Sequence, residues 1–250
     1  MENNEPAAAL QGLSKSYGDF AAVSEVDLVV ARGERFALLG PNGAGKTTTI
    51  RMLMGILEPS AGSARIMGHD CFAQRAQVMR HVGYLPDEPI FYDYLRGREV
   101  LEFVMRMRGL ADNGPTAARR DALIERFELG DDLEEFAVNY SKGMKKKLAI
   151  IAALLHEPDF LILDEPTNGL DPYATRIFHD LIREQSEEGR SVLFSTHLLD
   201  QAERLCHRVA IMEKGRIAAL GTLDELKHGL APGGTLEDLF FRVTARDHDS

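Results

Sequence analysis

Residues 40–47 read Gly40-Pro41-Asn42-Gly43-Ala44-Gly45-Lys46-Thr47 and match the pattern G-x-x-x-x-G-K-[ST]. An apolar run at 36–39 predicts a buried strand before this stretch. The apolar pattern at 50–57 predicts a helix after it, which ends near Pro59. Glycines in such a loop let successive backbone N–H groups turn toward phosphate oxygens, and the following helix directs its dipole at the same anion. The stretch therefore predicts a strand–loop–helix unit that binds a nucleoside triphosphate.

The polar side chains at the end of this loop carry the chemistry. Lys46 is predicted to place its charge against the outer phosphates, and Thr47 to offer its hydroxyl to Mg²⁺. Thr48 follows as a further candidate. The expected nucleotide-binding residues of the loop are Gly40, Pro41, Asn42, Gly43, Ala44, Gly45, Lys46, Thr47 and Thr48.

A second apolar strand ends in two carboxylates. Residues 160–165 read Phe160-Leu161-Ile162-Leu163-Asp164-Glu165. At the end of a buried strand, Asp164 is predicted to hold Mg²⁺ through water and Glu165 to polarise the attacking water. The alternative is that both are solvated carboxylates at the start of a loop. These motifs alone leave kinases, small GTPases and helicases possible.

Strand and helix patterns alternate at both ends of the chain, which predicts an α/β core with a parallel sheet. The middle, residues 88–155, has helical periodicity and few strand signals, and we expect an inserted helical subdomain there. In it, one helical face carries Val100, Leu101, Phe103, Val104 and Met107. The other expected elements are strands at 9–13, 26–30, 160–163 and 192–194, a helix at 174–187, a hairpin at 209–220 around Lys214-Gly215, and a helical tail after Gly221.

Composition limits the classes of partner. The 250 residues include 29 basic and 39 acidic side chains, giving a net charge of −10, which disfavours nucleic acid as the main partner. The longest apolar run, at 149–155, is far shorter than the roughly 20 residues of a membrane span. The acidic residues at 1–5 do not fit a signal peptide. We therefore expect a cytoplasmic protein without a span of its own.

Three further motifs occur in a fixed order around the strand at 160–165. Tyr140-Ser141-Lys142-Gly143-Met144 precedes it, and Gly169-Leu170-Asp171-Pro172 and Ser195-Thr196-His197 follow it. In this order, and over residues 10–243, the sequence resembles the nucleotide-binding subunit of an ABC transporter. The resemblance implies one ABC ATPase domain over 1–250. It would contain a RecA-like α/β core at 1–87 and 156–221 with an N-terminal antiparallel β-subdomain, the helical subdomain at 88–155, and a helical tail at 222–250.

The resemblance also implies partners and site roles. ATP and Mg²⁺ would bind in a head-to-tail dimer of two copies or paralogues, and hydrolysis would drive a separate membrane permease at the cytoplasmic face of the inner membrane. Ser141 and Gly143 would cap the ATP held by the partner, since they open a helix with free N–H groups. The remaining implied contacts are Tyr17 on adenine, His197 on the γ-phosphate and Asp171 across the dimer.

Two motifs depart from the family. Tyr140, Lys142 and Met144 replace three residues of the usual Leu-Ser-Gly-Gly-Gln signature, although its Ser and second Gly are retained. Asp87 stands where the family has a Gln that links Mg²⁺ and water to the permease contact, and it remains a candidate metal ligand. The lysine run at 145–147 is expected to be a solvated helix face rather than a nucleic-acid patch.

The signature variant and the ending at 235–240 resemble exporter-type systems, so export is favoured over import. The alternative is a soluble ABC ATPase acting on nucleic acid or ribosomes, but such proteins usually carry two cassettes or long coiled-coil insertions. A regulatory module with little turnover is a third possibility, and it is disfavoured because Lys46, Asp164, Glu165 and His197 are all present.

Overall fold

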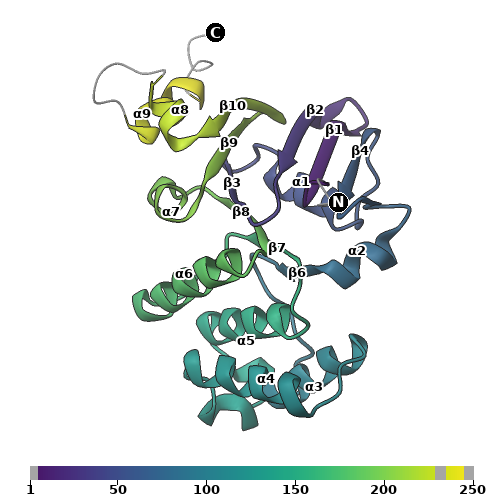
Figure 1. The fold of residues 1–250 in the computed structure, drawn as a ribbon, viewed down its shortest axis with the longest axis vertical. Coiled ribbons are helices and arrows are strands. Elements are labelled where there is room, and N and C mark those ends of the chain that lie inside the picture. The colour runs from purple at the N-terminus through teal and green to yellow at the C-terminus, as the bar shows by residue number, and fades with distance from the viewer. Residues whose placement is uncertain (1–4, 229–234, 245–250) are drawn as a thin grey trace.

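The computed structural model describes residues 5–228 and 235–244, and a six-stranded sheet runs through its centre (Figure 1). The strand order is β10-β9-β3-β8-β7-β6, with parallel pairing from β9 to β6 and an antiparallel edge at β10. The strands are β3 (Arg35–Leu39), β6 (Val82–Leu85), β7 (Phe160–Asp164), β8 (Ser191–Thr196), β9 (Arg208–Glu213) and β10 (Arg216–Thr222). The predicted α/β core is confirmed.

The central sheet separates two hydrophobic cores. Along β3, Ala37 and Leu39 enter the first core and Phe36 and Leu38 enter the second, as the period of two in a strand requires. A strand buried on both faces reads as a continuous apolar run, which is why the run at 36–39 could be recognised. Helices α5 (Lys142–Leu154), α6 (Pro172–Glu187) and α7 (Leu199–Leu205) contribute to the first core.

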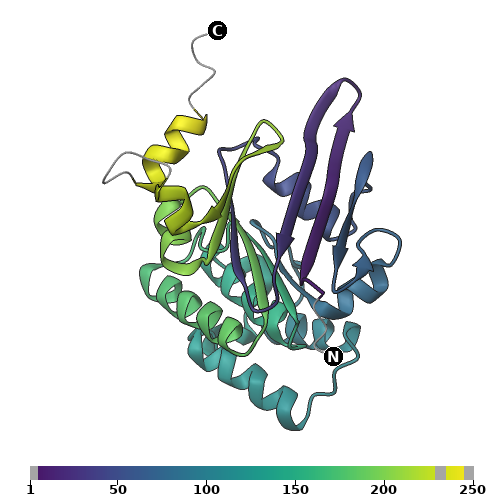
Figure 2. The ribbon, with the colours of Figure 1, turned by 45° about the horizontal axis from the view of Figure 1, so that its top comes forward.

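The second core lies between the central sheet, helix α1 (Lys46–Leu53) and a second, antiparallel sheet, which forms a separate layer in Figure 2. Its strand order is β2-β1-β4-β5. The strands are β1 (Ala8–Tyr17), β2 (Phe20–Val30), β4 (Ala61–Ile66) and β5 (His69–Asp70). The expected N-terminal antiparallel layer is therefore present, with β1 and β2 longer than predicted.

The predicted helix at 50–57 is wrong at both ends. Helix α1 begins at Lys46, directly after Gly45, and its last residue is Leu53. It ends early because Gly55 takes a left-handed backbone with φ 60°, and a side chain there would meet the Cys71 carbonyl oxygen at 2.1 Å. The phosphate loop and the helix start thus follow each other without a gap.

Helices dominate residues 97–154, and in Figure 1 they lie together below the sheets. They are α3 (Gly97–Met107), α4 (Gly114–Arg126) and α5, with the short 3₁₀ turns Asp131–Glu134 and Ala137–Asn139. In α3 the predicted apolar face is partly wrong, because Val100, Leu101 and Met105 are buried whereas Phe103 and Met107 are exposed. The inward face of α3 is therefore rotated from the prediction.

The C-terminal part contains the predicted hairpin, in which β9 and β10 pair around Lys214-Gly215. Both turn residues have positive φ, 46° and 77°, as a tight two-residue hairpin turn requires. Helices α8 (Leu223–His228) and α9 (Leu236–Thr244) follow, and α2 (Arg75–His81) lies earlier, before β6. Residues 229–234 and 245–250 of the expected tail are outside the described residues. Within the described ranges, no helix is long and apolar enough to cross a membrane.

Gly83 in β6 gives a test of core packing. A Cβ atom at this position would lie 2.4 Å from the Ala153 carbonyl oxygen and 2.8 Å from Leu161 and Pro158 side-chain atoms. We expect Gly83→Ala to lower the free energy of unfolding by about 1–3 kcal/mol through overpacking, measured by urea denaturation.

The matched control is Gly130→Ala. Gly130 has helical dihedrals, φ −58° and ψ −47°, and a Cβ there would meet only the Ile124 side chain at 3.9 Å. This variant should unfold at a urea midpoint equal to or above that of the wild type. Equal stability of the two variants would contradict the packing described for β6.

Candidate functional site

The phosphate loop joins the end of β3 to the start of α1 through a tight path. Gly45 precedes the helix with φ 107°, and a side chain there would lie 2.8 Å from the Ala22 carbonyl oxygen. A Cβ atom on Gly40 would lie 2.5 Å from the Met212 carbonyl oxygen. Glycine is required at both positions because neighbouring backbone fills the space of a side chain. The glycines predicted from the motif thus shape the loop itself.

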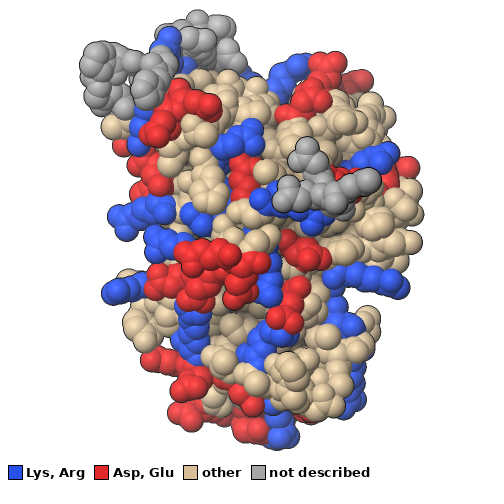
Figure 3. Space-filling view, in the orientation of Figure 1, with Lys and Arg blue, Asp and Glu red and all other residues tan. Residues whose placement is uncertain are grey.

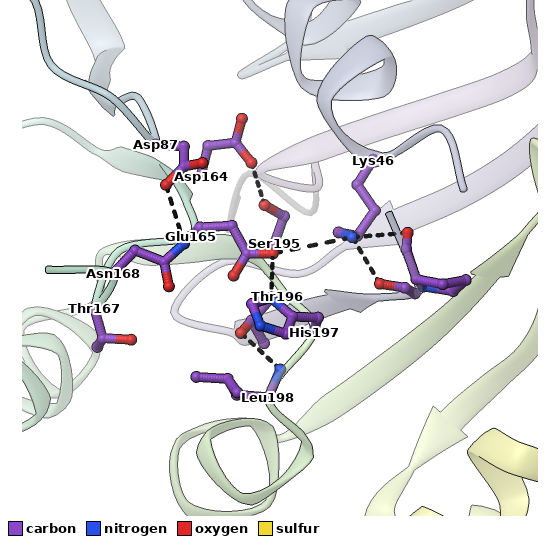
Figure 4. Close-up of polar contacts among 12 residues, drawn as sticks. Lys46, Asp87, Asp164, Glu165, Thr167, Asn168, Ser195, Thr196, His197 and Leu198 are labelled. Atoms are coloured by element: carbon purple, nitrogen blue, oxygen red, sulfur yellow. Dashed lines mark hydrogen bonds and ion pairs between the residues drawn. The ribbon is translucent and has the colours of Figure 1, made fainter. Parts of the chain in front are cut away.

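Lys46 lies at the bottom of this loop and is only 6% exposed. Its Nζ donates to the carbonyl oxygens of Gly40 at 2.7 Å and Pro41 at 3.2 Å, and lies 4.0 Å from Glu165 Oε1 (Figure 4). Burial lowers the pKa of Lys46 below its usual value, while the carboxylates of Glu165 and Asp164 oppose this shift. The ammonium group is therefore held in place by backbone carbonyl oxygens and a nearby carboxylate.

The predicted carboxylates lie at the end of β7, next to Lys46 (Figure 4). Asp164 accepts a hydrogen bond from the Ser195 hydroxyl at the end of the neighbouring β8. Glu165 takes a left-handed backbone with φ 43°, unusual for a residue other than glycine, and its N–H donates to the Ser195 carbonyl oxygen at 3.1 Å. Both carboxylates are buried, so neither is a solvated group at a loop start.

The two oxygens of Glu165 differ in their surroundings. Oε1 is 3.0 Å from Nδ1 of His197, whereas Oε2 is buried and lacks a hydrogen-bond partner among the described residues. A buried carboxylate oxygen without a partner is costly, and such atoms are usually satisfied by water or a ligand. Oε2 is therefore the free acceptor in this site.

These groups face a pocket of about 280 Å³. Its lining includes the predicted Asn42, Gly43, Ala44, Gly45, Lys46, Thr47, Thr48, Asp87, Asp164 and Glu165. It also includes two residues that the sequence analysis missed, Phe20 and Ala22 from the start of β2. The sequence signal for Phe20 is its position directly after the Gly18-Asp19 turn. In the structure its side chain is 66% exposed. The pocket therefore has an aromatic wall next to its phosphate loop.

Other candidate residues lie outside this lining within the described chain. Tyr17 is the last residue of β1, paired with Phe20 across the hairpin, and is exposed. Ser141 caps α5, its hydroxyl accepting from the Met144 N–H at 3.2 Å, and a Cβ on Gly143 would meet the Gly169 carbonyl oxygen at 2.8 Å. Asp171 caps α6 in the same way, and the hydrogen bond from the Ala174 N–H lowers its pKa. In one chain, these caps have local structural roles.

The donor set fits Mg²⁺ bound together with a nucleotide. Within the described residues, no group of three His, Cys, Asp or Glu side chains could hold an ion alone. Mg²⁺ in nucleotide sites commonly uses one or two protein oxygens, with phosphates and waters completing an octahedron. Thr47 and Asp164 line the same pocket and offer oxygen donors of this kind. Asp87 lines it as well, so the structure brings the three candidate ligands together.

One prediction about the lysine run is wrong. Lys146 is completely buried rather than solvated, because its side chain turns inward from α5. Its Nζ donates to the carbonyl oxygens of Pro86, Asp87 and Glu165. Burial lowers the pKa of Lys146 to about 8, with the nearby Asp87 carboxylate opposing the shift. Lys146, which was expected on the solvated face of α5, thus connects this helix to the nucleotide pocket.

Comparison with known proteins agrees with this geometry. Residues 23–168 match the ABC transporter family. The chain is 42% identical over 217 residues to the ABC transporter ATP-binding protein YdbJ of Bacillus subtilis, covering 86% of this chain and 69% of that protein. It is 39% identical over 238 residues to the daunorubicin resistance ATP-binding protein DrrA3 of Streptomyces coeruleorubidus, covering 95% and 74%.

Solved structures agree in fold. A structure described as the ATP-binding subunit of an ABC transporter superposes with a TM-score of 0.90 at 36% identity, covering 95% of this chain and 99% of that one. The ATP-binding cassette MJ0796 shares the fold at 20% identity with a TM-score of 0.78. The phosphate loop, the two carboxylates and these relatives together show that the chain belongs to the ABC transporter family, as an ATP-binding subunit that hydrolyses ATP to drive transport.

Proposed function

We propose that this subunit binds ATP with Mg²⁺ in the pocket beside Lys46, with Glu165 as the general base. The observation that carries this assignment is the buried carboxylate of Glu165, which lines the pocket and whose Oε2 lacks a hydrogen-bond partner among the described residues. A water held there would be within reach of a carboxylate that accepts its proton. His197 contacts the other oxygen of the same carboxylate at 3.0 Å and fixes its orientation.

The other groups bind and orient the phosphates. Lys46 would exchange its contacts with the Gly40 and Pro41 carbonyls for phosphate oxygens, and the backbone N–H groups at the start of α1 would hold the same anion. Bound Mg²⁺ would offset phosphate charge during transfer, held by Thr47, Asp164 and Asp87. Tyr17 and Phe20, exposed at the tip of the β1–β2 hairpin, are positioned to contact the adenine base.

The active unit in this proposal is a head-to-tail pair of copies. Ser141 is exposed at the start of α5, and the N–H groups of that first turn lack helical acceptors, so they can receive a phosphate from another chain. Asp171 caps the start of α6, and its Oδ2 lies 3.8 Å from Nζ of Lys147 in α5. The starts of the two helices therefore lie near each other. Each nucleotide would lie between the phosphate loop of one copy and Ser141 of the other.

A permease would dock in an apolar groove below the sheets. This groove of about 400 Å³ is lined by Tyr84, Pro86, Pro89, Ile90, Phe91, Phe103, Val104, Met107 and Arg108 among others. Ile90 is 91% exposed and Tyr92, whose ring edge contacts Phe103, is 69% exposed. Exposed apolar groups gathered in this way usually mark an interaction site. Pro86 also borders Asp87, which joins the groove to the nucleotide pocket.

We propose export as the direction of transport and the cytoplasmic face of the inner membrane as the location. Support comes from the relative DrrA3, named as a daunorubicin resistance protein. Nucleic acid is not the proposed partner, since the net charge is −10 and acidic side chains gather near the centre of the face drawn in Figure 3. A soluble ABC ATPase acting on nucleic acid or ribosomes is therefore the less favoured function.

The proposed base is tested by Glu165→Gln, which keeps shape and hydrogen bonding but removes the proton acceptor. We expect the rate of ATP hydrolysis to fall by roughly 10²–10⁴ while ATP still binds. The measurement is phosphate release together with equilibrium binding of a fluorescent ATP analogue. The control, Glu102→Gln, changes an exposed glutamate on α3 and should hydrolyse at the wild-type rate. Wild-type turnover by Glu165→Gln would refute the assignment.

The shared site is tested with two variants that are each inactive. Lys46→Ala loses charge-assisted phosphate contacts worth about 1.5–3 kcal/mol, and Ser141→Arg blocks the capping surface. In a mixed dimer, one site carries both defects and the other is intact. After subunit exchange, about half of the dimers are mixed and each has one intact site, so roughly a quarter of all sites are intact. ATPase activity should recover to about this fraction of the wild-type rate, or less if both sites must act together. No recovery with exchange confirmed would count against this arrangement.

The docking groove is tested by a double replacement, Ile90→Ser in its lining and Tyr92→Ser, whose ring contacts the lining residue Phe103. Binding of the chain to membranes of its source cell should weaken by about tenfold or more, because the apolar contact area is lost. ATP affinity should not change. The control pair, Val29→Ser and Leu220→Ser, alters exposed strand residues away from the groove. Equal membrane binding by both pairs, measured by sedimentation, would exclude the groove as the docking site.

A further inference from the structure

Lys146 connects three segments that are far apart in the sequence. From α5, its Nζ donates to the carbonyl oxygens of Pro86 at 3.2 Å and Asp87 at 2.6 Å, in the loop after β6. It also donates to the carbonyl oxygen of Glu165 at 3.1 Å, at the end of β7. An ammonium group has three donor hydrogens, so these three carbonyls use its full capacity. The side chain is 0% exposed, so water does not compete for these contacts.

The charge of Lys146 also has a specific neighbour. Its Nζ lies 3.9 Å from Asp87 Oδ1, and the same oxygen accepts a hydrogen bond from Asn168 Nδ2 at 3.1 Å. Asp87 lines the nucleotide pocket together with Asp164, Glu165 and Lys46. Three carboxylates around a site for a polyanion would repel it unless cations offset them. Lys146 supplies a cation on the side of Asp87, as Lys46 does on the side of Glu165.

We infer that Lys146 and Asp87 work as one charge-matched pair, in which Lys146 is a positioning residue that holds the Asp87 loop against the backbone of Glu165. The pair makes an aspartate acceptable beside the nucleotide phosphates. It also fixes the distance between the catalytic carboxylate and the loop that leads into the apolar groove. This inference rests on the proposed role of Glu165 as the base.

The consequence for the reaction follows from the contacts. Without the Lys146 charge, Asp87 would face the phosphates as a carboxylate that only bound Mg²⁺ offsets. The resulting repulsion acts on nucleotide affinity and on turnover. If Asp87 is made neutral at the same time, the repulsion disappears, and a neutral donor at position 146 can still hold the carbonyls. Neutralising both members should therefore do less harm than neutralising Lys146 alone.

The test is a double-mutant cycle in the full-length chain, with Lys146→Gln, Asp87→Asn and the combination. Phosphate release gives kcat and KM, and equilibrium titration with a fluorescent ATP analogue gives a dissociation constant. Thermal unfolding of each protein reports folding. The matched control is Lys145→Gln, which removes a lysine charge from the adjacent, partly exposed position of α5.

We expect Lys146→Gln to lower kcat by about tenfold or more and to weaken ATP-analogue binding. We expect the double variant to lose less of both values than Lys146→Gln does, by about threefold or more. Lys145→Gln should match the wild type. Losses that multiply in the double variant, or a wild-type kcat in Lys146→Gln, would overturn the inference. A lowered unfolding temperature with unchanged kcat per folded molecule would also overturn it, because it would show a purely structural role.

Should Lys146→Gln not fold, Asp87→Asn alone decides. It leaves the Lys146 charge without its carboxylate neighbour, so binding of the ATP analogue, titrated without Mg²⁺, should tighten. A dissociation constant equal to that of the wild type would contradict the pairing. The proposed function is tested separately, because turnover at the wild-type rate in Glu165→Gln would refute Glu165 as the base. If Glu165→Gln loses turnover and the losses in the Lys146–Asp87 cycle multiply, Glu165 remains the proposed base and the Lys146–Asp87 pair is refuted.

Discussion

A lysine ammonium group held away from water at the start of α1 is the constraint on which this structure depends. Desolvating a cation costs several kcal/mol unless hydrogen bonds and opposite charge offset it. Here the carbonyls of Gly40 and Pro41 and the carboxylate of Glu165 do so. That arrangement requires the sharp turn at Gly45, a strand β3 buried on both faces, and β7 next but one in the same sheet. The order of the central strands follows from bringing these groups together.

The same physical solution occurs a second time, between the helical region and the sheet. Lys146 is buried among carbonyls as Lys46 is, and both contact Glu165, one through its backbone oxygen and the other through its carboxylate. Glu165, the proposed general base, is therefore contacted by lysines from two helices, α5 and α1. Its left-handed backbone, with φ 43°, is maintained by this surrounding set of contacts. Side-chain packing alone would not fix that conformation.

Local signals made much of the fold predictable. The phosphate loop, β7 and the β9–β10 turn each depend on neighbouring residues, so motif and turn chemistry located them. Strand β4 (Ala61–Ile66) was missed because its residues have little β propensity, and it is a strand through its pairing with β1 and β5. Lys146 and Phe20 were missed for a similar reason. The burial of Lys146 arises only from tertiary contacts. The same is true of the closeness of Phe20, at the tip of the β1–β2 hairpin, to the phosphate loop.

The contact between Gly143 and Gly169 affects how related sequences should be interpreted. A Cβ atom at position 143 would come within 2.8 Å of the Gly169 carbonyl oxygen, so glycine is needed there for the chain to pack, whether or not a nucleotide is ever capped. Copies of this cassette that have lost catalysis would keep the residue for that reason alone. A surviving glycine in the signature is thus weak evidence of an active enzyme. A change at Glu165, the proposed general base, would be the more informative mark of a degenerate copy.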